Sequence, residues 1–177
     1  MKTGIIIQAR TGSKRFPNKV FAYFNGKFVI DHVIDEMKKI SLPLVVAIPN
    51  TPSNDGLDNH LQKRNITVFR HFENDVLNRI YKCAVWHEFD IIIRVCADSP
   101  KIRAKDIFDN LAKFIQEKQA RMIWGQNSWI FNFKMLMEVN FSSPHAEDRE
   151  HCGFHYMSKT VDFIDDIDRL NNHWEIQ

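Results

Sequence analysis

Short apolar runs rich in β-branched residues constrain the fold of this chain more than any other feature. Continuous apolar character over four to eight residues is typical of strands buried on both faces. Amphipathic patterns at helical spacing lie between these runs. The runs cover residues 4–9, 44–48 and 90–95, with shorter candidates at 66–69 and 122–124. The alternation predicts an α/β fold with a mostly parallel sheet and helices on both faces.

The helical segments are predicted from their apolar spacing and from polar residues that suit a helix start. One helix is expected over residues 29–37, a second from Asn54 or Asp55 to Arg64, and a third capped by Asn74. The third helix is expected to bury Val76, Leu77, Ile80, Tyr81, Ala84 and Val85. A fourth is expected around residues 107–115.

The C-terminal third is less regular than the rest of the chain. A helix is predicted over 133–139, a loop over 142–148 and a final helix from Asp165, while the aromatic side chains of residues 124–133 are predicted to be core. No repeat or linker-like change in composition is present. We therefore expect a single domain over residues 1–177 with an irregular C-terminal third.

Charge and composition exclude several classes of function. The chain has 177 residues and a formal net charge of +2, which gives no sign of a nucleic-acid or membrane partner. No run approaches the roughly 20 apolar residues that span a bilayer. Its 3 cysteines are widely spaced, which argues against a disulfide framework or a cysteine-rich zinc site. The expectation is a cytoplasmic protein in which Cys83 and Cys96 are core residues.

The segment after the first predicted strand carries the clearest functional signal. Arg10, Lys14, Arg15 and Lys19 lie close together around Gly12 and Ser13. Guanidinium and ammonium groups bind phosphate oxygens, and open α/β sheets bind ligands at the carboxyl ends of their strands. The glycine spacing fits neither a Walker A loop nor a dinucleotide fingerprint. The loop is thus interpreted as a nucleoside triphosphate site, with a solvated basic turn as the alternative.

This opening resembles that of a known enzyme family. The string IIIQARTGSKRFPNKV is similar to the first motif of the cytidylyltransferases that activate acidic sugars, especially the spore-coat polysaccharide branch, related to the acylneuraminate and Kdo enzymes. Segments 68–79, 94–100, 147–151 and 160–167 resemble later family motifs in the same order. The resemblance implies a Rossmann-like three-layer α/β/α fold of the nucleotide-diphospho-sugar transferase type.

The resemblance also implies an activity and a set of site residues. CMP would pass from CTP to a small acidic sugar, with Mg²⁺ as cofactor and release of pyrophosphate. The implied catalytic residues are Arg10, Lys19 and Asp98, and the implied metal ligands are Asp98 and Asp162. Arg149 and His151 would contact the sugar. The implied nucleotide-binding residues are Gln8, Ala9, Arg10, Gly12, Ser13, Arg15, Lys19 and Arg70.

Departures from the family pattern leave alternatives open. Ala97 replaces a usual glycine, Phe163-Ile164 replaces Thr-Pro, and His151 lies closer to Asp162 than in typical members. The shortened segment bears on the sugar pocket and on whether the chain forms a homodimer. The alternatives are a non-catalytic nucleotide-binding relative and a nucleotidyltransferase with another base or acceptor. From the residues alone, Asp98 could simply shape a turn, Asp162 could cap the last helix, and Arg94 could be a buried salt-bridge partner.

Overall fold

A computed structural model describes residues 1–13, 16–117, 120–125, 127–153 and 156 of the chain. A central sheet of six strands has the order β5-β4-β1-β6-β8-β7. Its parallel part comprises β5 (Thr67–His71), β4 (Leu44–Pro49), β1 (Thr3–Gln8) and β6 (Ile91–Cys96). Strands β8 (Ser128–Asn132) and β7 (Met122–Gly125) continue the sheet in antiparallel pairing.

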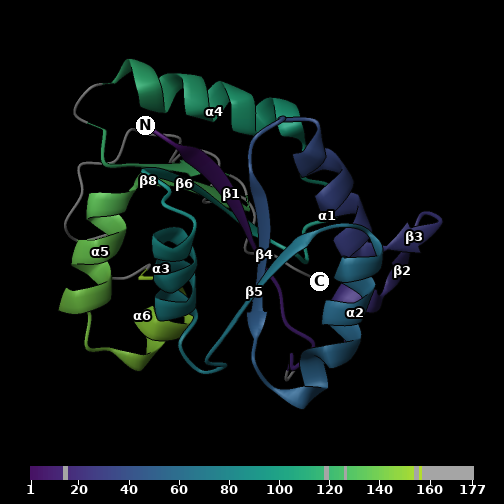
Figure 1. Ribbon diagram of the computed structural model, residues 1–177. Coiled ribbons are helices and arrows are strands. Elements are labelled where there is room, and N and C mark those ends of the chain that lie inside the picture. The colour runs from purple at the N-terminus through teal and green to yellow at the C-terminus, as the bar shows by residue number, and fades with distance from the viewer. Residues whose placement is uncertain (14–15, 118–119, 126, 154–155, 157–177) are drawn as a thin grey trace.

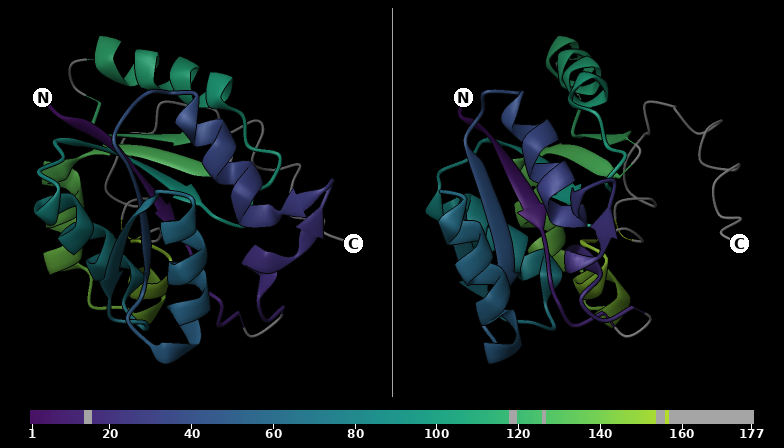
Figure 2. Two further views of the ribbon diagram at one scale, coloured as in Figure 1. Left: turned by 45° about the vertical axis from the view of Figure 1, so that its right-hand side comes forward. Right: turned by 90° about the vertical axis from the view of Figure 1, so that its right-hand side faces the viewer.

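Helices cover both faces of this sheet, which confirms the predicted layers (Figure 1). One face carries α1 (Val29–Lys38), α2 (Asp55–Lys63) and α4 (Ala104–Gln116). The other carries α3 (Val76–Trp86), α5 (Phe133–Ser142) and α6 (Ala146–Glu150). A hairpin of β2 (Tyr23–Phe24) and β3 (Lys27–Phe28) projects beside α1 and α2, as Figure 2 also shows. Two short 3-10 turns, η1 (Lys19–Phe21) and η2 (Pro52–Asn54), follow β1 and β4.

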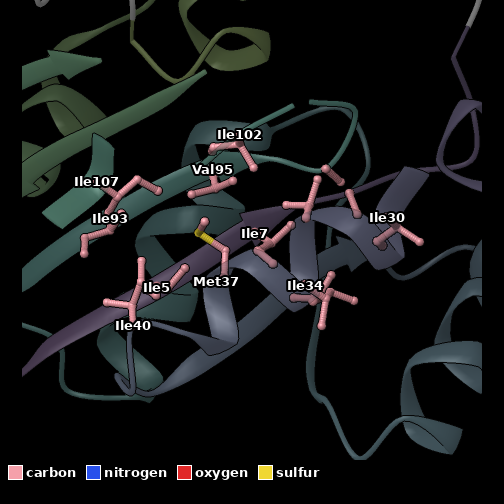
Figure 3. Packing of buried hydrophobic residues seen from close by; sticks show 14 of the residues in the cluster. Ile5, Ile7, Ile30, Ile34, Met37, Ile40, Ile93, Val95, Ile102 and Ile107 are labelled. Atoms are coloured by element: carbon pink, nitrogen blue, oxygen red, sulfur yellow. The ribbon is translucent and has the colours of Figure 1, made fainter. Parts of the chain in front are cut away.

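Alternation along the buried strands divides the core between the two faces. Ile5 and Ile7 of β1 pack with α1 and α4, as Figure 3 shows, whereas Ile6 packs with α3 and α5. Each face buries a continuous apolar cluster, so the parallel strands read as unbroken apolar runs rather than alternating ones. Among the described residues, no helix is long and apolar enough to cross a membrane.

The parallel strands are added first on one side of β1 and then on the other, and this change positions the site. From β1 the chain passes through α1 to β4 and through α2 to β5, then crosses back through α3 to β6 on the other side of β1. The carboxyl ends of β1 and β6 therefore form a topological switch point, where open α/β sheets leave room for a ligand.

Several local expectations were wrong. Helix α3 is capped by Asp75, whose carboxylate accepts a hydrogen bond from the Asn78 backbone N–H at 2.9 Å, and not by Asn74. Val85 is exposed rather than buried. The predicted loop over 142–148 contains the start of α6, and β8 was missed altogether. The helix expected from Asp165 lies outside the described residues.

Candidate active site

The loop after β1 is anchored at its base and closed on itself. The Thr11 N–H donates to Asn54 Oδ1 at 3.0 Å, and the Thr11 hydroxyl donates to the Ser53 carbonyl at 3.0 Å. The Asn18 N–H donates to the Thr11 carbonyl at 2.9 Å, which brings the two ends of the loop together. Asn54 is fully buried, so η2 holds the start of this loop against the carboxyl end of β4. Sequence reasoning missed Asn54 as a loop anchor and gave it only a capping role.

Two ion pairs link the basic residues of the loop to carboxylates elsewhere in the chain. Lys19 Nζ lies 3.1 Å from Asp98 Oδ2, just beyond the end of β6, and both side chains are nearly half exposed. Arg10 donates a hydrogen bond at 3.0 Å to Oε1 of Glu150, which is the last residue of α6. The structure thus brings the three predicted catalytic residues, Arg10, Lys19 and Asp98, to one edge of the sheet. Exposed pairs of this kind are worth at most about 1 kcal/mol, so an incoming anion or cation can replace either partner.

Gly12 lies close to a neighbouring loop, a contact that the sequence did not indicate. A β-carbon on Gly12 would lie 3.1 Å from the Glu73 carboxylate, at the loop between β5 and α3. Gly12 therefore allows a close approach between two loops rather than an unusual backbone angle. Ser13 donates its N–H to the Thr11 carbonyl at 3.0 Å, so that N–H already has a partner. Lys14 and Arg15 lie outside the described residues.

Arg70 and Arg149, predicted to contact substrate, both have carboxylate partners. Arg70 donates to Asp55 at 2.7 Å and to Asp58 at 2.9 Å, which ties β5 to α2. Arg149 binds both oxygens of Asp75, at 2.9 and 2.6 Å, and also reaches Asn140. A substrate carboxylate would have to displace Asp75 to reach the Arg149 guanidinium. His151 follows α6 and is exposed.

Replacing Arg149 tests whether this contact supports the fold. We expect Arg149→Met to lower the free energy of unfolding by about 2 kcal/mol, because the change removes charged hydrogen bonds between α6 and the start of α3. Urea unfolding measures the change. The matched control is Arg103→Met, which removes an equally bidentate contact to Asp106 from a side chain that is 71% exposed. Equal stability of the wild type and the Arg149 variant would contradict this assignment.

Beneath the edge lie two buried guanidinium groups that have no ion pair with a carboxylate in the described ranges. Arg79 is 0% exposed and donates to the Phe72 and Glu73 carbonyls, while its Nε and second terminal nitrogen have no hydrogen-bond partner among the described residues. Burial lowers the pKa of Arg79. Arg94 is 7% exposed, donates to Gln8 and lies 4.3 Å from the centre of the Trp129 ring. Among the described residues Arg94 makes no salt bridge, so the possibility of a buried salt-bridge partner stays untested.

The cysteines differ in their surroundings. Burial raises the pKa of Cys83 to about 12, which agrees with the predicted core role. Cys96 is partly exposed at the end of β6, and Cys152 is buried against Gln8. Asp162 lies outside the described residues. No group of three or more candidate metal ligands occurs in the part of the chain that the structure describes.

Comparison with known proteins agrees with this geometry. Residues 4–173 match the sequence model of the family described as cytidylyltransferase. The chain belongs to the cytidylyltransferase family. A solved cytidylyltransferase from Leptospira borgpetersenii superposes on this family member with a TM-score of 0.82 at 26% identity, covering 90% of this chain and 72% of that one.

Two curated relatives are longer than this cytidylyltransferase-family chain. An uncharacterised protein of Methanocaldococcus jannaschii is 27% identical over 159 residues, which cover 85% of this chain and 65% of that protein. The spore coat polysaccharide biosynthesis protein of Bacillus subtilis is 32% identical over 101 residues, covering 54% of this chain and 42% of that protein. The chain thus spans less than two thirds of the length of these relatives. A solved CMP:2-keto-3-deoxy-manno-octonic acid synthetase complexed with CTP shares the fold, with a TM-score of 0.70 at 15% identity, covering 90% of this chain and 86% of that one.

Proposed function

We propose that this protein is a Mg²⁺-dependent cytidylyltransferase that transfers CMP from CTP to an acidic sugar and releases pyrophosphate. The contact of Lys19 with Asp98 at 3.1 Å is the observation that supports this best. It joins a basic loop after β1 to a carboxylate after β6 at the switch point of the sheet. A triphosphate with its metal requires cations and a carboxylate side by side.

The basic residues of the edge bind and orient the nucleotide. Arg10 and Lys19 exchange Glu150 and Asp98 for phosphate oxygens, and Lys19 then faces the pyrophosphate that leaves. The sugar hydroxyl forms a bond to the α-phosphorus while the bond from that phosphorus to the bridging oxygen of the β-phosphate breaks. The proton of the hydroxyl passes to solvent. Fixing these groups in line supplies most of the acceleration that the protein itself provides.

Asp98 fits the role of a magnesium ligand. It offers an exposed carboxylate directly after a strand, and Mg²⁺ is often held by one or two carboxylates together with substrate phosphates and water. When bound, the ion supplies charge neutralisation at the phosphates. Asp162 is proposed as the second carboxylate, from the family resemblance of its segment.

A non-catalytic nucleotide-binding relative is the second candidate. Two features favour it: His151 lies closer to Asp162 than in typical members of the family that the chain resembles, and Arg149 is engaged by Asp75. Such a protein would bind CTP through the same edge without an acceptor pocket.

Pyrophosphate release separates these candidates. The protein is incubated with Mg²⁺, each of the four nucleoside triphosphates and a panel of sugar acids that includes 3-deoxy-manno-octulosonate. We expect release with CTP, dependent on one of the acceptors, and none when EDTA removes the metal. Binding of CTP without turnover on any acceptor would support the non-catalytic candidate and contradict the proposed activity.

A further inference from the structure

Three hydrogen-bond donors converge on one oxygen of Gln8. Arg94 donates from Nε at 3.1 Å and from a terminal nitrogen at 2.6 Å to Gln8 Oε1, and the Cys152 thiol lies 3.5 Å from the same atom. A guanidinium group can only donate hydrogen bonds, so the Gln8 carboxamide must turn its oxygen, and not its NH₂ group, toward Arg94. The Gln8 amide nitrogen therefore lies on the side away from Arg94. The donors of Arg94 thus fix the orientation of the Gln8 carboxamide.

Two neighbouring strands and the ring of Trp129 hold Arg94 in place. Arg94 lies opposite Ile6 and Cys96 lies opposite Gln8, so Arg94 and Gln8 share one face of the sheet. The guanidinium lies over the Trp129 ring at 4.3 Å. With its position fixed on the strand and on the ring, Arg94 can fix the carboxamide in turn.

The third donor comes from the end of α6. Cys152 has a left-handed backbone with φ of 54°, at a position after a helix where glycine is usual. The Gly153 N–H donates to the Asp148 carbonyl at 2.7 Å and closes the helix. Burial raises the pKa of the Cys152 thiol, so it remains an S–H donor at neutral pH. Cys152 thus adopts a backbone conformation that is unfavourable for a residue with a side chain, and its thiol lies beside Gln8 in this conformation.

Gln8 is the last residue of β1 and pairs with Cys96 at the end of β6, two residues before the proposed metal ligand. The main-chain carbonyl of Gln8 accepts a hydrogen bond from the Ala97 N–H at 3.0 Å, one residue before Asp98. Within the described residues the Gln8 amide nitrogen has no hydrogen-bond partner, and the side chain is only partly buried. With respect to the described part of the chain, its N–H groups can therefore donate to water or to a ligand at this edge of the sheet. The nearby positive charge of Arg94, which makes no direct ion pair with a carboxylate in the described ranges, favours an anionic acceptor.

We propose that Gln8 donates a hydrogen bond to a non-bridging oxygen of the α-phosphate of the nucleotide, and that Arg94 is the positioning residue that orients it. The inference rests on the proposed function for the presence of that phosphate beside Asp98. It assigns Arg94 and Cys152 a part in substrate recognition although neither touches the substrate.

The substitution Gln8→Glu separates recognition from folding. A glutamate keeps acceptor oxygens for Arg94 and Cys152, and it lacks the N–H donors and repels a phosphate. We expect thermal unfolding at or above the wild-type temperature, while the Kd values for CTP and CMP with Mg²⁺ rise roughly tenfold or more in calorimetric titrations. Inorganic pyrophosphate does not occupy the position of the α-phosphate, so the Gln8→Glu change is expected to weaken its binding less than it weakens the binding of CMP. Gln116→Glu, at the exposed end of α4, is the control for the added charge.

The variant Arg94→Lys tests the positioning role. Lysine keeps the charge but not the forked donor, so the carboxamide is free to rotate. We expect Arg94→Lys to weaken CMP binding. Adding this change to the Gln8→Glu variant should cause no further loss of CMP affinity, because both changes remove the same hydrogen bond to the α-phosphate. Additive losses would overturn the positioning role.

Each other outcome is also decisive. The inference is overturned if Gln8→Glu binds CTP and CMP within twofold of the wild type, if pyrophosphate weakens as much as CMP, or if the variant unfolds at a lower temperature. Failure of the wild-type protein to bind CTP would instead overturn the proposed function.

Discussion

The variant Asp98→Asn is expected to lower kcat for CMP transfer by about a hundredfold, or ~3 kcal/mol in activation free energy. The amide keeps the size of the side chain and removes the negative charge that we propose for the metal. Because Asp98 is exposed and its only described ion pair is with Lys19, folding should be unaffected. Pyrophosphate release measures the rate, and urea unfolding measures stability.

Asp109→Asn is the matched control for this variant. Asp109 is also an exposed carboxylate paired with a lysine, Lys105, at 2.6 Å, but on α4. The control should retain wild-type kcat and stability. If Asp98→Asn retained wild-type turnover, Asp98 would be removed from the mechanism.

The second large effect is expected at Gly4, in the middle of the sheet. A β-carbon there would lie 2.2 to 2.4 Å from three ring atoms of Phe89, and Phe89 is 2% exposed. The ring cannot swing into solvent without opening the core. We expect Gly4→Ala to lower the free energy of unfolding by about 3 kcal/mol or more, through overpacking.

Gly56→Ala provides the opposite result for the same chemical change. Gly56 lies in α2, and a β-carbon there would meet nothing within 4 Å. Alanine is favoured over glycine in helices by up to ~1 kcal/mol, so this variant should be more stable than the wild type. Urea unfolding of the two variants tests both statements. A loss of less than 1 kcal/mol in Gly4→Ala would contradict the packing described for Phe89.

The parallel strands could be predicted because their signal is local. Burial on both faces makes β1, β4 and β6 unbroken apolar runs, and the intervening helices show a single apolar face. Strand β8 was missed because its aromatic residues suit any buried segment. Helix α6 was missed because it has only five residues and its N-cap residue, His145, makes no side-chain capping bond.

The meeting of the basic loop with Asp98 at the carboxyl ends of β1 and β6 was predictable from the sequence, whereas the hydrogen-bond partners of the arginines around it were not. The basic loop and Asp98 are visible as residues that follow strands, so their meeting at one edge follows from parallel topology. The contact between Gln8 and Arg94 joins residues 86 positions apart, and that between Arg149 and Asp75 joins residues 74 apart. Such pairs depend on strand register and helix packing, which residue types alone do not specify.

Titration of the protein with CTP, UTP, ATP and GTP, with and without Mg²⁺, tests the central claim most directly. If the edge formed by β1 and β6 is a CTP site, calorimetry will show one CTP bound per chain. The other three nucleotides will bind at least tenfold more weakly, and EDTA will weaken CTP binding. Equal affinity for all four nucleotides, or no binding of CTP, would contradict the account.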